Sequence, residues 1–250
     1  MANPGLVLVT GSSGRVGQAV IAELQRQGTP VRGLDRVPTP GLVDMVVGDL
    51  QNVSALERAM TGVGTLIHLA ATPDDDDFLR ELVPNNVIGV YYVFEAARKA
   101  GVGRMILASS GQVVWYQRET GPWPIRADTA PTPRYWYAAC KLFLEGAGRA
   151  FTEAHGMSVI AVRLGWCPRT RAQVEEIKQS EWAQDVYLSP PDAGRFFACA
   201  VTAPVDTRFT VVYATSRPRR SQRYDMEPAK KLGYEARDTW PQGLEAAGLA

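Results

Sequence analysis

Tyr137 and Lys141 have the residue types and the spacing of a proton-transfer pair. They lie four positions apart in a segment of helical periodicity, so both side chains project from one face of the predicted helix. A free tyrosine has a pKa of about 10 and is a poor base, but a neighbouring ammonium stabilises the phenolate and favours proton transfer near neutral pH. The same spacing also occurs on ordinary helices with an exposed tyrosine beside a charge. The position of the pair relative to the other predicted elements must therefore decide whether it is catalytic.

A serine pair ends the apolar run that precedes this helix. Ser109 and Ser110 are consecutive, and in an extended segment their side chains point in opposite directions. We predict that Ser110 hydrogen-bonds the same substrate oxygen as Tyr137 and that Ser109 is a backbone or cofactor contact. The reverse assignment of the two serines stays open.

A glycine-rich turn follows the first apolar run. Leu6 to Val9 leads into T-G-S-S-G-R-V-G at Thr10 to Gly17, and an amphipathic segment comes next. In such a strand–turn–helix unit Gly11 permits a tight turn, Gly14 lets the backbone approach a phosphate, and Gly17 lets the helix pack on the sheet. The helix N-terminus offers unpaired N–H groups and a positive dipole to a diphosphate. The spacing G-x-x-G-x-x-G differs from G-x-G-x-x-G, so this dinucleotide site needs support from other residues.

Asp35 provides that support. It ends the second predicted strand, roughly twenty residues beyond the glycine turn, where a carboxylate accepts hydrogen bonds from a ribose 2′-hydroxyl. A carboxylate would repel the 2′-phosphate of NADP, which favours NAD as the cofactor. Arg15 and Arg36 flank the same site, and because a guanidinium pairs well with phosphate, NADP stays the less favoured alternative.

The apolar pattern alternates between strands and helices. Strands are predicted at about 5–10, 31–35, 43–47, 64–70, 103–109 and 157–164, and helices at about 14–27, 52–61, 78–100 and 134–155. This alternation is typical of a Rossmann-type α/β fold, a doubly wound parallel sheet with helices on both faces. Right-handed crossovers place the carboxyl ends of the strands along one edge, so Thr10, Asp35, Asp49, Ala70 and Ser110 should gather there.

After residue 164 the pattern changes. Loops rich in Arg, Pro and Trp surround a helix near 190–203, a strand near 208–214 and a short helix near 226–232. We therefore divide the chain into a dinucleotide-binding domain with the Ser-Tyr-Lys site, residues 1–165, and a small substrate-binding lid, residues 166–250. The lid is expected to pack on the domain as one compact unit.

The composition excludes several classes of partner. With 250 residues, 46% of them hydrophobic, and a net charge of +1, the chain can bury one α/β core and has no basic run that would favour nucleic acid. The run Asp74 to Asp77 is most simply a solvated loop or a helix N-terminus. The 3 cysteines and 2 histidines have no metal-binding spacing, so we expect no metal site. With no signal-peptide pattern and no long apolar run, we expect a cytoplasmic protein without a membrane partner.

With these motifs together, the chain resembles the extended short-chain dehydrogenase/reductase superfamily, whose members include NAD-dependent epimerases and dehydratases. The motifs are T-G-S-S-G-R-V-G, Asp35, G-D-L at Gly48 to Leu50, H-L-A-A at His68 to Ala71, Asn86, the serine pair and Y-A-A-C-K at Tyr137 to Lys141. They cover roughly the first 165 residues in the expected order, and their joint agreement is far more specific than any single motif.

The resemblance implies a catalytic set of Ser110, Tyr137 and Lys141, in which Lys141 lowers the pKa of Tyr137 and holds the nicotinamide ribose. It also implies that Asp49 and Leu50 lie by the adenine, that Asn86 supports the active-site network, and that His68 is structural. The cofactor-binding residues predicted in this way are Gly11, Ser13, Gly14, Arg15, Val16, Gly17, Asp35, Arg36, Asp49, Leu50, Leu69, Ala70, Ala71, Asn86, Ser109, Tyr137 and Lys141.

Within the superfamily the chain is most similar to the uronate dehydrogenase group, in the segments S-S-G-Q-V-V-W-Y, Y-L-S-P-P-D and F-T-V-V-Y-A-T. Enzymes of that group oxidise C1 of a hexuronic acid to a lactone with NAD, which implies a sugar or sugar-acid substrate. The chain departs from the group at Gly111-Gln112, where the group carries Asn-His, and in a longer loop from Cys167 to Gln184. The predicted substrate-binding residues are Thr72, Ser110, Gly111, Gln112, Tyr137, and Arg169 and Arg171, either of which is a candidate to clamp a carboxylate. Candidate stacking faces for the sugar ring are Trp115, Tyr116, Trp123, Trp136 and Trp166.

Two other functions stay open. An NAD-dependent sugar epimerase or dehydratase uses the same tyrosine and lysine but generally has a larger C-terminal domain than this chain offers. A dinucleotide-sensing or regulatory protein would bind the cofactor without turnover, and such a protein has no evident need for a phenolate. The superfamily often pairs through its long helices, here about 78–100 and 134–155, so a homodimer or a higher homo-oligomer is also open.

Overall fold

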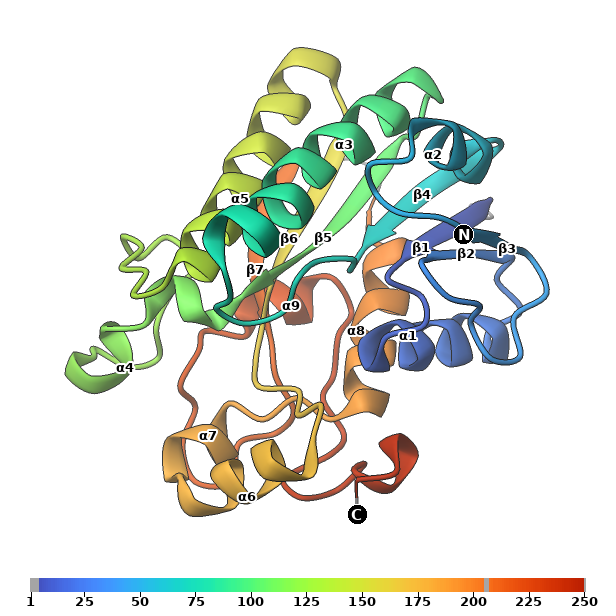
Figure 1. Cartoon of the computed structure of the whole chain (residues 1–250). Coiled ribbons are helices and arrows are strands. Elements are labelled where there is room, and N and C mark those ends of the chain that lie inside the picture. The colour runs from blue at the N-terminus through green and yellow to red at the C-terminus, as the bar shows by residue number, and fades with distance from the viewer. Residues whose placement is uncertain (1–4, 205–206, 250) are drawn as a thin grey trace.

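Seven parallel strands form one sheet in the order β3-β2-β1-β4-β5-β6-β7 (Figure 1). The computed structural model describes residues 5–204 and 207–249. The strands are β1 (Leu6–Thr10), β2 (Val31–Asp35), β3 (Met45–Val47), β4 (Val63–His68), β5 (Arg104–Ser110), β6 (Ser158–Leu164) and β7 (Phe209–Ala214). The chain order reverses between β1 and β4, which makes that junction the topological switch point where ligands bind in such sheets. The predicted doubly wound parallel sheet is therefore confirmed.

Helices cover both faces of the sheet (Figure 1). On one face lie α1 (Arg15–Arg26) and α8 (Pro190–Val201), and on the other lie α2 (Val53–Met60), α3 (Gly89–Lys99) and α5 (Trp136–His155). The residues of β1 alternate between the two layers, because Val7 and Val9 join the buried cluster of α1 and α8 whereas Leu8 joins that of α2 and α3. A strand that is apolar on both sides requires cover on both sides.

The predicted helix over 78–100 is regular only in its second half. It begins with two π-helical turns, η1 (Phe78–Leu82) and η2 (Pro84–Ile88), and continues as α3. Pro84 has no N–H to donate to the regular helical ladder, which explains why the α-helical pattern starts after it.

The segment from Cys167 to Gln184 is helical, so its prediction as a loop was wrong. It contains α6 (Arg171–Gln179) and α7 (Glu181–Asp185). Ile177 is the buried residue of α6, so the helix lacks the apolar stripe that marks a helix in a sequence. Its start is set by the hydroxyl of Thr170, which accepts a hydrogen bond from the Gln173 N–H at 3.2 Å. The remaining short elements are η3 (Gly111–Val114), α4 (Gln117–Thr120), α9 (Glu227–Lys231) and η4 (Glu245–Ala247).

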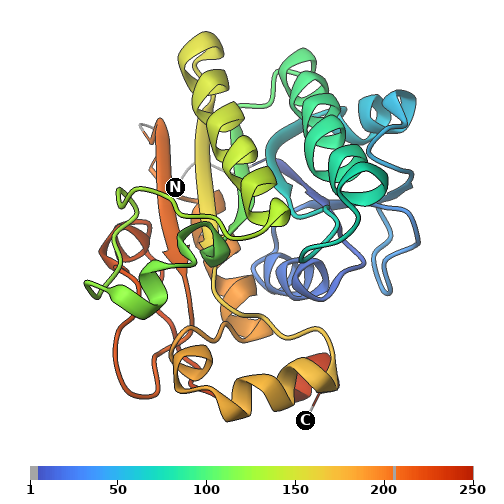
Figure 2. The same cartoon turned by 60° about the vertical axis from the view of Figure 1, so that its left-hand side comes forward.

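Helices α6 and α7 and the C-terminal segment form a lobe beyond the carboxyl ends of the strands (Figures 1 and 2). Ile177, Tyr187, Trp240 and Leu244 pack together in its apolar cluster. Helix α8 and strand β7 also follow residue 165, but they complete the sheet rather than the lobe. The boundary at residue 165 therefore separates β7 from the other strands of its sheet, and the division into 1–165 and 166–250 stays a prediction about folding units.

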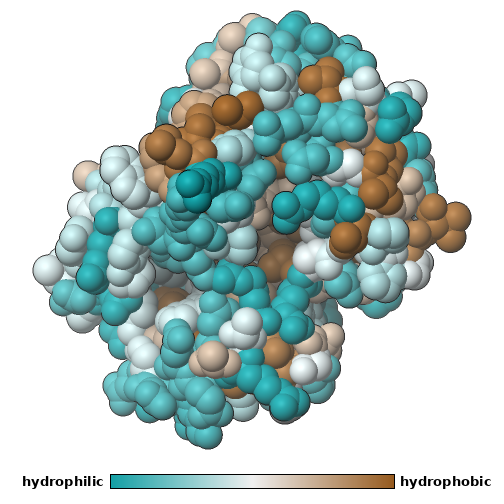
Figure 3. Space-filling model, viewed as in Figure 1, coloured by the Kyte–Doolittle hydropathy of each residue, from teal (hydrophilic) through white to brown (hydrophobic). Residues whose placement is uncertain are grey.

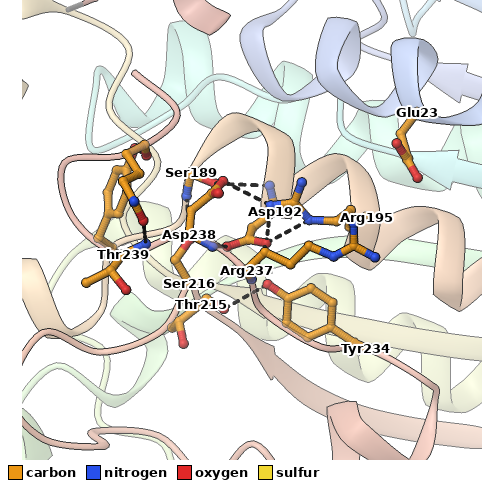
Figure 4. Close-up of polar contacts among 12 residues, drawn as sticks. Glu23, Ser189, Asp192, Arg195, Thr215, Ser216, Tyr234, Arg237, Asp238 and Thr239 are labelled. Carbon is orange, nitrogen blue, oxygen red and sulfur yellow. Dashed lines mark hydrogen bonds and ion pairs between the residues drawn. The ribbon is translucent and has the colours of Figure 1, made fainter. Parts of the chain in front are cut away.

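A buried carboxylate fastens the C-terminal segment to α8 (Figure 4). Asp192 is fully buried and accepts hydrogen bonds from Arg195 Nε at 2.9 Å, from Ser216 Oγ at 2.7 Å, and from the backbone N–H groups of Arg237 and Asp238 at 3.0 Å each. Asp238 in turn accepts a bond from Arg195 at 2.9 Å. Because both oxygens of Asp192 have partners, the fold tolerates a charge at this depth.

Residues 5–204 and 207–249 include no helix that is both long and apolar enough to cross a bilayer. The same residues contain no group of three or more His, Cys, Asp and Glu side chains placed to hold a metal ion. The cytoplasmic location expected from the sequence stays a prediction.

Candidate active site

The turn between β1 and α1 has the close backbone packing that its glycines predicted. A methyl group at Gly17 would lie 2.1 Å from the Gly11 carbonyl oxygen, and one at Gly11 would lie 2.7 Å from the Ala70 nitrogen. Gly11 also has a φ of +71°, which favours glycine. Gly14 caps α1 without a side-chain hydrogen bond, so the N–H groups of the first helical turn are open to an anion. This turn fits the diphosphate of a dinucleotide.

A cavity of about 1020 Å³ extends from this turn to the lobe. Figure 3 shows it as a hollow between the body of the molecule and the lobe, with apolar side chains at its floor. The cavity is lined by the residues predicted from the sequence to bind cofactor or substrate, with the exceptions of Asn86 and Arg171. The glycine turn and Tyr137 therefore open onto one space.

Asp35 lies at the end of β2 beside the glycine turn. Its carboxylate accepts hydrogen bonds from the backbone N–H of Ser13 at 2.9 Å and from that of Arg36 at 2.7 Å. These two bonds fix the carboxylate and leave further lone pairs for a ribose hydroxyl. The flanking Arg15 points toward the lobe, where its Nε donates to the Arg169 carbonyl oxygen at 2.8 Å and its Nη1 donates to that of Ala247.

Ser110, Tyr137 and Lys141 converge at the carboxyl end of β5. The Lys141 Nζ lies 5.5 Å from the centre of the Tyr137 ring and donates to the carbonyl oxygen of Ala108 at 2.8 Å. Ser110 Oγ accepts a bond from the Gln112 N–H at 3.1 Å, which starts η3. The first helical turn of α5 is held in place because the Tyr137 N–H donates to Asp75 at 3.0 Å.

The surroundings of Tyr137 act on its acidity in opposite directions. Burial raises the pKa of Tyr137 above its ordinary value and the charge of Asp74 raises it further, while the charge of Arg169 and a hydrogen bond with Ser110 lower it. From the sequence, Lys141 was expected to lower this pKa, but in the structure Arg169 and Ser110 lower it. Burial lowers the pKa of Lys141 to about 8.

The two serines point in opposite directions, as their spacing requires. Ser109 Oγ donates to Glu145 at 2.6 Å, and Glu145 forms a buried ion pair with Arg163 at 2.9 Å. The Ser109 side chain therefore belongs to a structural network, whereas Ser110 lies beside Tyr137. This placement supports the choice of Ser110 as the serine that hydrogen-bonds the substrate oxygen.

Asn86 acts through Thr72 rather than by lining the cavity. Its side chain accepts a hydrogen bond from the Thr72 N–H at 2.8 Å and donates to the Thr72 carbonyl oxygen at 2.9 Å. Its neighbour Asn85, which the sequence analysis did not single out, lines the cavity and donates to the Thr72 hydroxyl at 2.8 Å. Both asparagines position Thr72 at the substrate end.

Of the two arginines predicted to clamp a carboxylate, only Arg169 reaches the cavity. Arg171 is exposed at the start of α6 and does not line the cavity. The guanidinium of Arg169 forms an ion pair with Asp74, a residue whose sequence context had suggested only a loop or a helix start. Asp74 also accepts bonds from Gln112 at 3.4 Å and from Gln173 at 3.3 Å.

Aromatic side chains line the substrate end of the cavity. Of the predicted stacking residues, Trp115 and Trp166 line it, whereas Tyr116, Trp123 and Trp136 are exposed elsewhere. The cavity is also lined by three aromatic residues that were not predicted from the sequence, Tyr135, Trp182 and Tyr224.

Tyr224 fills the space that a side chain at position 111 would take. A methyl group at Gly111 would lie 2.5 Å from the Tyr224 hydroxyl. The Tyr224 ring stacks on Tyr213 with ring centres 4.2 Å apart. No local sequence signal marks Tyr224, because it comes from an irregular segment far along the chain.

Comparison with known proteins fits this arrangement. The model of the NAD dependent epimerase/dehydratase family matches residues 7–166, which span the glycine turn, Asp35 and the Ser-Tyr-Lys set. The chain belongs to this family. Membership confirms the predicted likeness to the extended short-chain dehydrogenase/reductase superfamily.

Within the family, the relatives of the chain include dehydrogenases of free and phosphorylated sugars. It is 32% identical to an NAD-dependent glucose-6-phosphate dehydrogenase of Haloferax volcanii, over 93% of each chain. It is 28% identical to an L-arabinose 1-dehydrogenase (NAD(P)(+)) of the same organism, over 93% of this chain and 96% of the relative. A solved structure of a mutated uronate dehydrogenase is 27% identical and superposes with a TM-score of 0.79, over 97% of this chain and 85% of that one. The predicted similarity to the uronate dehydrogenase group is confirmed.

Proposed function

We propose that the protein oxidises the anomeric C1 hydroxyl of a free sugar or sugar acid to a lactone, with NAD as the hydride acceptor. That it is an NAD-dependent dehydrogenase acting on CH–OH groups follows from its family and from its sugar-oxidising relatives. The choice of C1 is supported by the printed name of the arabinose relative, a 1-dehydrogenase, and by the likeness to a uronate dehydrogenase.

The observation that carries this proposal is the shared cavity. Ser110, Tyr137 and Lys141 open onto the same space as the glycine turn and Asp35. A dinucleotide with its diphosphate at the turn and its adenosine ribose at Asp35 would extend toward the carboxyl end of β5. Its reactive end would then meet the Ser-Tyr-Lys set.

The side chains have distinct roles in the proposed reaction. Tyr137, as phenolate, takes the proton of the substrate hydroxyl while the hydride leaves the same carbon. Ser110 donates a hydrogen bond to the oxygen that becomes the lactone carbonyl. NAD, when bound, would supply the hydride acceptor at the nicotinamide C4, and the positive charge of its ring would favour the phenolate form of Tyr137. Lys141, which donates to the Ala108 carbonyl oxygen and lines the cavity, would orient the cofactor through a ribose hydroxyl.

Asp35 supports NAD over NADP in this proposal. Its carboxylate is fixed at the end of β2, and a 2′-phosphate would meet its charge. From the sequence, Arg15 and Arg36 were both candidates to bind the 2′-phosphate of NADP. The Arg15 side chain instead points toward the lobe and donates to the Arg169 carbonyl oxygen.

The family name also supports a second candidate, an NAD-dependent sugar epimerase or dehydratase, which uses the same tyrosine and lysine. Purified protein with NAD and a panel of free sugars and nucleotide-sugars separates these functions. A dehydrogenase accumulates NADH and lactone, whereas an epimerase gives an isomerised sugar without net NADH. Bound NAD with neither product would indicate a dinucleotide-sensing protein and would refute the proposal.

A further inference from the structure

Asp74 forms an ion pair with Arg169, an arginine of the cavity that could otherwise bind the carboxylate of an acidic sugar. Resting on the proposed dehydrogenase function, we propose that the substrate is a neutral aldose rather than a uronate or a sugar phosphate, and that Asp74 determines this specificity by neutralising Arg169.

Asp74 is held at the substrate end by groups from separate parts of the fold. Arg169 precedes α6, Gln173 lies on α6, and Gln112 lies on η3, and all three donate to the Asp74 carboxylate. Asp74 has a φ of +61°, a left-handed conformation in which aspartate is one of the better tolerated non-glycine residues. Its backbone and its side chain are therefore both fixed toward the cavity.

This arrangement disfavours a carboxylate on the substrate. Arg169 is placed to meet a uronate carboxylate, but its charge is already matched by Asp74. Arg118 also lines the cavity, and its guanidinium lies over the Trp115 ring at 4.2 Å and 3.9 Å from Glu119. A uronate would have to displace one carboxylate with another or lie beside it, and like charges at close range are unfavourable. Such a fixed repulsive group is a common way to discriminate against a related ligand.

The Asp74 charge also reaches the reacting centre. It is one of the groups that raise the pKa of Tyr137, so it lies close enough to act on any substrate placed on that phenol. An additional anion on the substrate would add to the charge that opposes the phenolate.

The same groups suit a neutral polyol. A carboxylate and two amides together offer both acceptors and donors, which is what sugar hydroxyls require. Trp115 and Trp166 line the adjoining walls and offer aromatic faces to the C–H side of a ring. A neutral aldose satisfies these groups without breaking the Asp74–Arg169 pair.

The first test is a substrate panel with the unmodified protein and NAD. Initial rates of NADH formation are compared for D-glucose, D-galactose and L-arabinose, and for D-glucuronate, D-galacturonate and D-glucose 6-phosphate. We expect kcat/KM for the best neutral aldose to exceed that for the best anionic sugar by about tenfold or more. A preference for an anionic sugar would overturn the inference and leave the dehydrogenase function standing.

The second test changes the charge of Asp74. Asp74→Asn keeps the shape and the left-handed backbone while freeing Arg169, so the uronate-to-aldose ratio of kcat/KM should rise about tenfold or more. Adding Arg169→Gln should abolish that gain, and Asp74→Glu should keep the preference for neutral sugars. Asp128→Asn is the matched control, because it neutralises an exposed aspartate paired with Arg126 at 2.9 Å, and neither of these two residues lines the cavity.

NAD binding and the melting temperature of each variant establish that it is folded. An unchanged ratio in a folded Asp74→Asn variant that still oxidises the aldose would overturn the inference. If NAD binds and no sugar of either class yields NADH, the proposed function itself fails, and the inference falls with it.

Discussion

Lys141 donates a hydrogen bond from Nζ to the carbonyl oxygen of Ala108 at 2.8 Å. The bond ties the first turns of α5 to the end of β5, shortly before Ser110. Tyr137 lies one turn earlier on the same helix face, so this link sets the phenol against Ser110. Lys141 thus holds Tyr137 beside Ser110, in addition to the role toward the ribose that is proposed for it.

Asp35→Ala should weaken NAD binding and narrow the preference for NAD over NADP. The change removes a fixed acceptor for the ribose 2′-hydroxyl and a charge that repels a 2′-phosphate, and a loss of about tenfold in NAD affinity is expected. Dissociation constants for both dinucleotides, measured by calorimetry, check this. Asp44→Ala, an exposed carboxylate paired with Arg32, should leave both constants unchanged. Preference for NADP in the unmodified protein would contradict the role given to Asp35.

Gly111→Ala should reduce kcat/KM about tenfold, because its methyl group would lie 2.5 Å from the Tyr224 hydroxyl and must displace it. Removing that hydroxyl with Tyr224→Phe in the same protein should restore part of the loss. Gly146→Ala is the control, since a methyl group there meets no neighbour within 4 Å. A double variant no better than Gly111→Ala alone would show that the two positions are not coupled.

His68 should make the protein less stable in mild acid. Burial lowers its pKa to about 3, and the charge of Lys141 contributes, whereas the unfolded chain takes up the proton near pH 6.5. The unfolded state therefore binds more protons between these values, and stability is lost as the pH falls below about 6.5, by about 1.4 kcal/mol per pH unit at most. The free energy of unfolding, measured in urea between pH 7 and pH 5, should fall less steeply with decreasing pH in His68→Gln than in the unmodified protein. Exposed His155→Gln should keep the original slope, and an equal slope in all three proteins would refute the assignment.

Asp192→Ala should destabilise the fold by about 3 kcal/mol, because it leaves Arg195 and two backbone N–H groups without their buried partner. The free energy of unfolding in urea measures this. Asp128→Ala removes a carboxylate whose pair with Arg126 has a similar distance, 2.9 Å, but is exposed, and it should change the free energy of unfolding far less. Equal losses of unfolding free energy in the two variants would show that the hydrogen bonds of Asp192 do not stabilise the attachment of the C-terminal segment.

Local patterns in the sequence were enough to predict the sheet and the cofactor end of the cavity. The glycine turn, Asp35 and the Tyr137–Lys141 spacing each depend on neighbours within one strand–turn–helix unit or one helix face. The alternation of apolar segments then fixes one edge of the sheet as their meeting place, and the cavity contains Gly11 and Tyr137 together.

The substrate end was less predictable because its contacts join distant segments. Asp74 and Arg169 are 95 residues apart in the chain, and nothing near Asp74 in sequence indicates a left-handed residue facing an arginine. Helix α6, which carries Gln173, is polar apart from a few positions and gives no apolar period. Tyr224 reaches Gly111 from an irregular segment, so only the folded chain brings them together.

Proton transfer by Tyr137 is tested most directly by Tyr137→Phe, assayed for NADH formation with the best sugar and for NAD affinity in the same preparation. If the hydroxyl acts mainly in proton transfer, as proposed, the rate should fall about a thousandfold while the NAD dissociation constant stays within about threefold. Exposed Tyr116→Phe should leave both quantities unchanged. An undiminished rate in Tyr137→Phe would contradict the account.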